Sequence, residues 1–134
     1  MLTIKPIPTL DKQKEILAKC GITYRDNHFA YQAYEGDELI AAAQFDILGE
    51  TAQIDAMRQV IDSKDDFEAM FILGRAVLNF LDLCGVCTAI YPSDKPDEQR
   101  LAKLLGFKDL NGVPTISLAG LFDAHCSSGS GCTL

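Results

Sequence analysis

The sequence lacks a long uninterrupted apolar run. Its longest apolar stretch, Met70 to Leu83, is broken by Arg75, Asn79 and Asp82. A membrane-spanning helix needs about 20 mostly apolar residues, and a secretory signal needs a short apolar core behind a basic start. We therefore expect no membrane segment and no signal peptide, and a soluble protein of the cytoplasm.

Basic residues are also scarce. The chain has 12 Lys and Arg against 19 Asp and Glu, which gives a net charge of -7. Nucleic-acid affinity depends on Lys and Arg that neutralise phosphates, so we predict no nucleic-acid partner. With 134 residues and 48% hydrophobic content, the chain is long enough for one domain that buries roughly two thirds of its unfolded surface.

The five cysteines cannot all pair with one another, and without a secretory signal they indicate thiols rather than a disulfide framework. Cys84 and Cys87 have the C-x-x-C spacing, and a tetrahedral zinc site would need four such ligands. His125, Cys126 and Cys132 could supply more. Because Cys84 ends a predicted helix and Cys87 begins a predicted strand, we expect two buried thiols that point apart, and no metal. Cys126 and Cys132 could form a disulfide, bind metal or stay free.

Hydrophobic periodicity divides the chain into alternating strands and helices. The predicted elements are an edge strand in residues 1–7, a helix that Thr9 caps and Gly21 ends, three antiparallel strands in 28–61, a helix in 65–84, a strand in 88–91, a short helix from Asp94 to Gly106, and a hairpin turning at Asn111-Gly112. A strand, a long helix and a strand indicate a parallel βαβ unit.

Three local features refine this pattern. The run 41–43 is three alanines, which indicates that a helix, or less readily a ligand, packs close to the sheet there. Gly74 costs its helix roughly 1 kcal/mol relative to alanine, which indicates close packing or the approach of a ligand. Pro114 cannot donate to a ladder, so its strand is predicted to lie at an edge.

Two segments resemble signatures of the GNAT acyltransferase fold. Residues 100–107, Arg-Leu-Ala-Lys-Leu-Leu-Gly-Phe, resemble the leucine, three residues, leucine-glycine-phenylalanine signature that closes the fold, and residues 73–78 resemble the start of the family's cofactor helix. The resemblance implies an α/β (α+β) fold of order βαβββαβαββ, with helices on both faces of a mixed sheet. It covers residues 1–118, and the Cys, Ser and Gly-rich residues 119–134 form a tail outside it.

The resemblance also implies acetyl-CoA as cofactor and an N-acetyltransferase activity toward an amine that the sequence does not identify. The pantetheine arm would pair with the main chain of Met57, Arg58, Gln59 and Val60. The pyrophosphate would lie at the start of the helix that contains Gly74 and Arg75, because helix N-termini bind anions. No metal is implied, and the sequence leaves a homodimer open.

The chemical positions of the family differ here. Many members have a tyrosine that protonates the departing thiolate, and this chain has Ala102 at that position. Tyr91, at the end of its strand, is the candidate replacement, and Asp55 or Asp46 is the candidate general base. The central glycine of the family's pyrophosphate loop is Ile72. The alternative function is therefore a catalytically inactive GNAT-fold module that binds a partner and has lost CoA chemistry.

Overall fold

The computed structural model describes residues 1–118, which contain seven strands and three helices. The strands are β1 (Leu2–Pro6), β2 (Phe29–Glu35), β3 (Glu38–Leu48), β4 (Thr51–Gln59), β5 (Thr88–Ile90), β6 (Lys108–Leu110) and β7 (Val113–Ser117). The helices are α1 (Leu10–Lys19), α2 (Phe67–Leu83) and α3 (Pro96–Leu105). This is the predicted order βαβββαβαββ, so the α+β prediction is confirmed.

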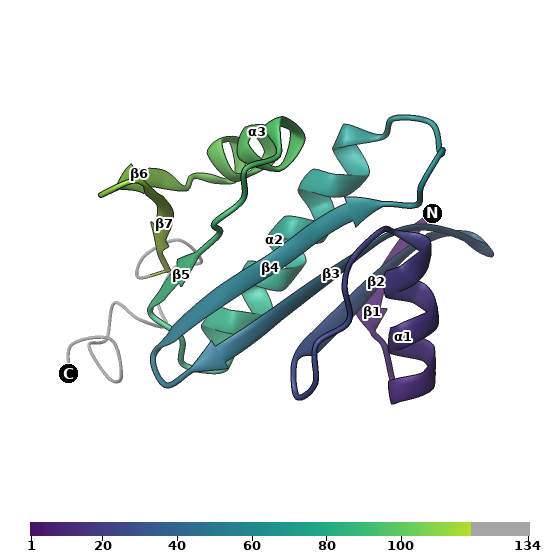
Figure 1. Ribbon diagram of the computed structural model, residues 1–134, viewed down its shortest axis with the longest axis horizontal. Coiled ribbons are helices and arrows are strands. Elements are labelled where there is room, and N and C mark those ends of the chain that lie inside the picture. The colour runs from purple at the N-terminus through teal and green to yellow at the C-terminus, as the bar shows by residue number, and fades with distance from the viewer. Residues whose placement is uncertain (119–134) are drawn as a thin grey trace.

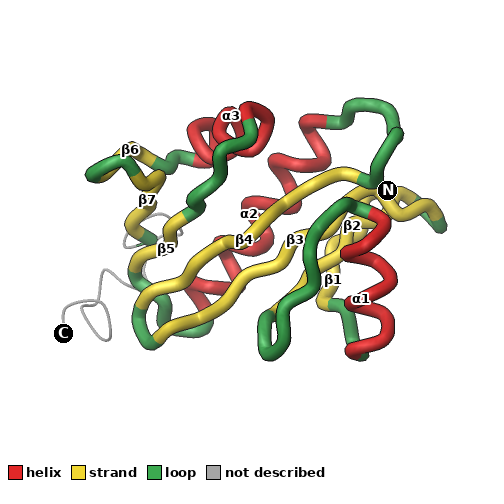
Figure 2. Tube along the Cα trace, in the orientation of Figure 1, coloured by secondary structure: helices red, strands yellow, loops and turns green. Residues whose placement is uncertain are grey.

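The seven described strands form one sheet in the order β1-β2-β3-β4-β5-β7-β6 (Figure 1). All neighbouring strands are antiparallel except β4 and β5, whose parallel pairing is confined to Thr51–Gln53 and Thr88–Ile90. Helix α1 covers one face, and α2, with α3 packed against it, covers the other (Figure 2). The sheet is therefore mixed and has helices on both faces, as predicted.

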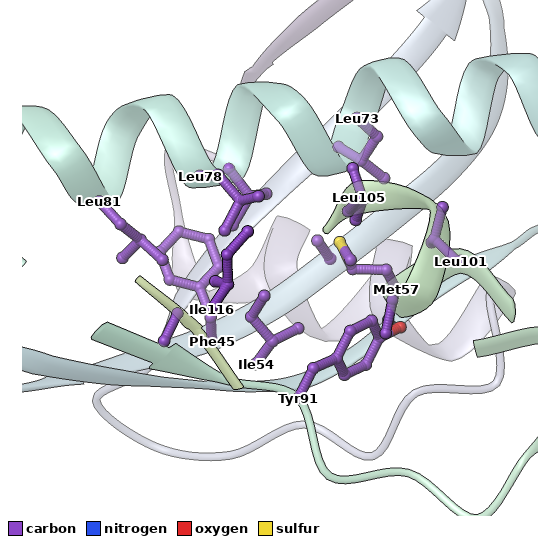
Figure 3. Packing of buried hydrophobic residues seen from close by; sticks show 14 of the residues in the cluster. Phe45, Ile54, Met57, Leu73, Leu78, Leu81, Tyr91, Leu101, Leu105 and Ile116 are labelled. Carbon is purple, nitrogen blue, oxygen red and sulfur yellow. The ribbon is translucent and has the colours of Figure 1, made fainter. Parts of the chain in front are cut away.

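The larger core lies between the sheet and α2. Figure 3 shows Leu73, Leu78 and Leu81 extending from α2 toward the buried side chains of the strands. Each such residue contributes about 1.5–3 kcal/mol through removal of its apolar surface from water. The alanines of residues 41–43 are fully buried, two against the α2 side and one against α1. The helix interpretation of that run is therefore correct, because helices pack close to β3 on both faces.

The helix ends agree only partly with the sequence prediction. Thr9 caps α1 as expected, since its hydroxyl accepts from the Lys12 amide at 3.2 Å. Asp94 does not cap α3: the N-cap is Lys95, with no side-chain cap hydrogen bond, and Ser93 Oγ accepts from the Lys95 amide instead. Gly106 ends α3 in the left-handed region, with φ 112°, a conformation that glycine adopts without strain.

The edge prediction from Pro114 is wrong, because β7 lies between β5 and β6. Tyr91 N donates to Pro114 O at 3.0 Å, but proline has no N–H to return to Tyr91. The ladder of β5 and β7 accordingly ends one residue earlier, at Ile90 and Thr115. Proline is tolerated here because β5 stops where the missing donor would be needed.

The rest of the architecture adds three facts. β1 is an edge strand, as predicted. No helix within residues 1–118 is long and apolar enough to cross a membrane. The predicted tail of residues 119–134, with Cys126 and Cys132, lies outside the described residues.

Candidate functional site where β4 and β5 separate

A cavity lies where β4 and β5 stop pairing. After Gln53 the strand β4 continues to Gln59 paired with β3 and no longer with β5, while the chain after β5 turns away toward α3 (Figure 1). The space between the end of β4 and the first turns of α2 and α3 is a cavity of about 780 Å³, which we call the β4–β5 cavity. It follows from topology, because two parallel strands that diverge leave one edge of each without a partner.

The β4 strand contains a β-bulge at Asp55. Gln44 of β3 lies opposite Ala56 and Phe45 lies opposite Ile54, so Asp55 has no residue opposite it. A bulge inserts one extra residue and reverses the alternation of everything that follows. The bulge therefore determines which groups of β4 face the cavity.

The main chain of β4 presents alternate amides to the cavity. Val60 N donates to Ile40 O of β3 at 3.0 Å. Because amides alternate along an extended strand, those of Gln59 and Met57 face away from β3, toward the gap beside β5. Met57 supplies the first of these amides after the bulge.

The carboxylate of Glu98, on α3, accepts a hydrogen bond from this amide. Its Oε1 accepts from Met57 N at 3.1 Å and from the Tyr91 hydroxyl at 2.6 Å, while the Tyr91 oxygen lies 3.2 Å from Met57 N. Glu98 is only 3% exposed. Figure 3 shows Tyr91 beside Met57 at the end of the core near Leu101. Glu98 thus joins β4, the end of β5 and α3 at the inner end of the cavity.

Arg58 provides the countercharge for this buried carboxylate. Its Nε donates to Glu98 Oε2 at 3.0 Å, and its Nη1 donates to Gly21 O. A buried charge is tolerated only when it is paired and hydrogen-bonded. Burial, followed by the charge of Glu98, raises the pKa of the Tyr91 hydroxyl, so the proton stays on Tyr91 as a donor to Glu98.

The start of α2 is satisfied by the chain itself. Asp66 Oδ1 accepts from the Ala69 amide at 3.1 Å. Gln59 Oε1 accepts from the Asp66 amide at 3.0 Å, and Gln59 Nε2 donates to Lys64 O at 2.7 Å. These bonds use an N-terminal amide and hold the approach to α2 against β4.

The charges lining the cavity balance. Three side chains are cationic and three are acidic: Arg58, Lys95 and Arg100, and Asp65, Asp97 and Glu98. The Arg100 guanidinium lies over the Phe67 ring, 4.1 Å from its centroid, which joins α3 to the first turn of α2 beside the cavity that both residues line. The lining side chains therefore carry no net charge, and a phosphate in the cavity would need to lie next to one of these cations.

The structure separates the predicted cofactor residues into two groups. Met57, Arg58, Gln59 and Val60 all line the β4–β5 cavity. Gly74 does not, since Leu105 packs against it. Arg75 is half-buried on the same helix and does not line the cavity either.

The predicted base, Asp55, lies in another environment. Its carboxylate is 8% exposed, and its Oδ2 lies 3.2 Å from His28 Nε2, which is also 4.0 Å from Asp46 Oδ2. Burial raises the pKa of Asp55, although the neighbouring His28 and Arg25 oppose that shift. Asp55 and Tyr91 therefore belong to two separate clusters.

Sequence reasoning missed Glu98. An acidic residue in the first turn of a helix is ordinary, because it faces the positive end of the helix dipole. Position 98 carries that pattern and no other. Its burial depends on the approach of α3 to β4, a contact between residues about 40 positions apart.

The C-x-x-C segment is not a pair of buried thiols. Cys84 is exposed at the end of α2, whereas Cys20 of the α1 region is buried. No group of three His, Cys, Asp or Glu that could hold a metal ion occurs in residues 1–118. The expectation of a buried thiol at position 84 is wrong, because the helix ends at the surface there.

Neither a comparison with protein-family models nor one with curated protein sequences finds a match. Solved structures do match over most of the chain. The ribosomal-protein-S18-alanine N-acetyltransferase of Escherichia coli is 16% identical, with a TM-score of 0.64, over 82% of this chain and 79% of its own. A Bacillus subtilis acetyltransferase in complex with CoA is 19% identical, with a TM-score of 0.64, over 81% and 77%. A GNAT family acetyltransferase from Elizabethkingia anophelis with acetyl-CoA bound is 13% identical, with a TM-score of 0.59, over 87% and 97%.

Proposed function

We propose that this chain, which has the fold of the GNAT acetyltransferases, binds acetyl-CoA in the β4–β5 cavity and transfers the acetyl group to an amine. The observation that carries the proposal is the cavity itself, which is bordered by the unpaired edge of β4 and by the first turns of α2 and α3. Structures with the same fold include acetyltransferases in complex with CoA and with acetyl-CoA.

The residues of the cavity fit an extended ligand that carries phosphates at one end. The main chain of Met57 to Val60 offers amides and carbonyls to a chain that lies along β4, as in the addition of a strand to a sheet edge. Lys95 and Arg100 provide cationic donors for phosphate oxygens. Gly74 and Arg75 stay predictions for this role.

Acetyl-CoA would supply an activated acyl group, and the chain would supply position and proton transfer. The β4 edge would orient the ligand, and the apolar side chains of Met70 and Leu101 would exclude water from one wall. Tyr91 stays our candidate donor and Asp55 our candidate base. The raised pKa of Tyr91 makes it a donor of hydrogen bonds rather than a strong acid.

A second function is favoured by a specific observation. Glu98 and the Tyr91 hydroxyl both occupy the Met57 amide, and Asp66 caps α2. These contacts satisfy groups that a cofactor would otherwise use, and Ala102 leaves no hydroxyl at the family's acid position. Under this reading the chain is a binding module with the GNAT fold and without acetyl transfer.

Calorimetric titration with acetyl-CoA tests the proposal. We expect one site per chain, with affinity weakened about tenfold in R100A, the loss of one charge-assisted hydrogen bond. K103A is the matched control, because Lys103 lies on the same helix and outside the cavity, and it should bind like the wild type. Absence of binding at millimolar ligand would exclude the transferase.

Thiol release separates the two functions once binding is found. Acetyl-CoA is incubated with a panel of primary amines, and free CoA thiol is measured. Acceleration by any amine over the amine-free rate supports acetyl transfer. Binding without acceleration by the panel supports the non-catalytic module.

A further inference from the structure

We infer that Glu98 is a displaceable internal ligand, whose carboxylate occupies the hydrogen-bonding position on β4 that an extended acyl ligand must take. The inference rests on the proposed function and adds to it how the ligand gains the site. Binding would then be an exchange, in which an acceptor atom of the ligand replaces the carboxylate at the Met57 amide.

The position of Glu98 supports the exchange. Met57 supplies the first amide after the bulge that faces the gap, and Met57 and Glu98 both line the cavity. Glu98 Oε1 lies 3.1 Å from that amide. A ligand atom and this oxygen cannot occupy one position, so any chain that pairs with the inner end of β4 must displace Glu98.

The groups left behind suit an acyl oxygen. Two donors converge on Glu98 Oε1, the Met57 amide at 3.1 Å and the Tyr91 hydroxyl at 2.6 Å. With the carboxylate withdrawn, both donors would be directed at the oxygen that replaces it. Fixed donors in a largely buried site are the arrangement that polarises a carbonyl group. Displacement of Glu98 would thus turn Tyr91 from a structural donor into a donor to the ligand.

Glu98 can leave without unfolding the core. It lies in the first turn of α3, where the N-cap residue Lys95 makes no side-chain cap hydrogen bond. The buried part of α3, with Leu101, Ala102 and Leu105, follows it. Rotation of the Glu98 side chain into the adjoining cavity brings the carboxylate to water and leaves Arg58 beside it.

Calorimetry on matched variants tests the exchange. Acetyl-CoA is titrated into the wild type, E98A and D97A. Asp97 is the control, because it lies in the same turn, lines the same cavity and carries the same charge. We expect D97A to change the affinity about twofold through charge alone, and E98A to raise it at least about tenfold, which corresponds to about 1.4 kcal/mol.

The outcomes distinguish the inference from the proposed function. Tighter binding of acetyl-CoA by E98A than by D97A supports the inference, even if the wild type does not bind. If the wild type does not bind, the transferase proposal fails for the wild type. Equal effects of E98A and D97A overturn the inference and leave the proposed function standing. Absence of binding by every variant overturns both.

E98Q and NMR cover the case in which E98A does not fold. The isosteric E98Q removes the charge and should raise affinity above that of D97A; an affinity no higher than that of D97A overturns the inference. In ¹⁵N-labelled wild type and E98Q, acetyl-CoA should shift the Met57 amide resonance most strongly among the amides of β4. A Met57 resonance that stays in place while the protein is saturated also overturns it.

Discussion

Leu105 of α3 packs directly on Gly74 of α2. A Cβ atom at position 74 would lie 2.5 Å from Leu105 Cδ1 and 3.3 Å from its Cγ. Real carbon atoms do not approach so closely, so the missing side chain is what lets the two helices pack at this distance. The glycine also sets where α3 lies, and hence where Glu98 meets β4.

G74A should destabilise the protein. Overpacking in a core typically costs about 1–3 kcal/mol, and the better helix propensity of alanine offsets about 1 kcal/mol of it. The free energy of unfolding, measured by urea denaturation, should fall by up to about 2 kcal/mol.

The effect of G74A on the free energy of unfolding should change sign when Leu105 is shortened. In an L105A background the space is open, so G74A should stabilise by about 1 kcal/mol through helix propensity. If G74A destabilises the L105A variant as much as it destabilises the wild type, Leu105 is not the obstacle.

Y91F should lower stability near neutral pH by about 1.5–3 kcal/mol, because it removes a buried hydrogen bond to a carboxylate. Burial raises the pKa of Tyr91 above its ordinary value of 10.0. Its stabilising effect is therefore fully present below pH 10 and declines above it, since the unfolded chain then loses the proton first. Urea denaturation between pH 8 and 11 should show the two proteins converging.

Alkaline absorbance gives an independent check on Tyr91. Wild type and Y91F should develop the same phenolate absorbance for as long as both remain folded. A wild type that gains one extra phenolate while folded would contradict the burial of this hydroxyl.

The pKa of Asp55 should move in opposite directions in two variants. Burial raises it, His28 lowers it and Asp46 raises it. H28Q should therefore raise it further and D46N should lower it, as measured by ¹³C NMR of the carboxyl group. Shifts of the same sign in both variants would contradict the arrangement of this cluster.

Replacement of Asp55 should change how stability depends on pH. Because the folded-state pKa is raised above the ordinary 3.8, the neutral form is favoured, and this stabilisation is lost as pH rises through the folded pKa. D55N mimics the neutral form. Its stability relative to wild type should increase from below pH 4 upward, as measured by urea denaturation.

Thiol reactivity should distinguish two cysteines. Cys84 is exposed, while burial raises the pKa of the Cys20 thiol to about 12, and only the thiolate reacts quickly. C84S should lose one fast-reacting thiol toward a disulfide reagent, and C20S should lose none. Fast loss in C20S would place its thiol at the surface.

The sequence predicted the fold well where one local pattern decided the outcome. Alternation gave β2 to β4, the glycine at 106 ended α3, and Asn111-Gly112, both with positive φ, formed the two-residue turn between β6 and β7. Predictions failed where a residue far away in the sequence determined the local structure. Pro114 lies inside the sheet because β5 ends beside it.

The site was only half accessible from sequence. Residues 57–60, which the family resemblance indicated, line the cavity because β4 extends beyond the residues that pair with β5. The role of Glu98 could not be read, because its three bonds join elements that only the folded chain brings together. Asp55 could not be assigned to a face, since a bulge leaves no mark in the residue types.

The extra residue in β4 has a further effect on what changes the chain can accept. Ile54 and Met57 lie in the same core although three positions separate them, which a regular strand would forbid. Substituting one side chain leaves this spacing intact. Adding a single residue between 54 and 57, with the bulge retained, would reverse the alternation once more and turn Arg58 toward the core. The segment is therefore expected to tolerate variation in residue type over generations, and to reject an added residue.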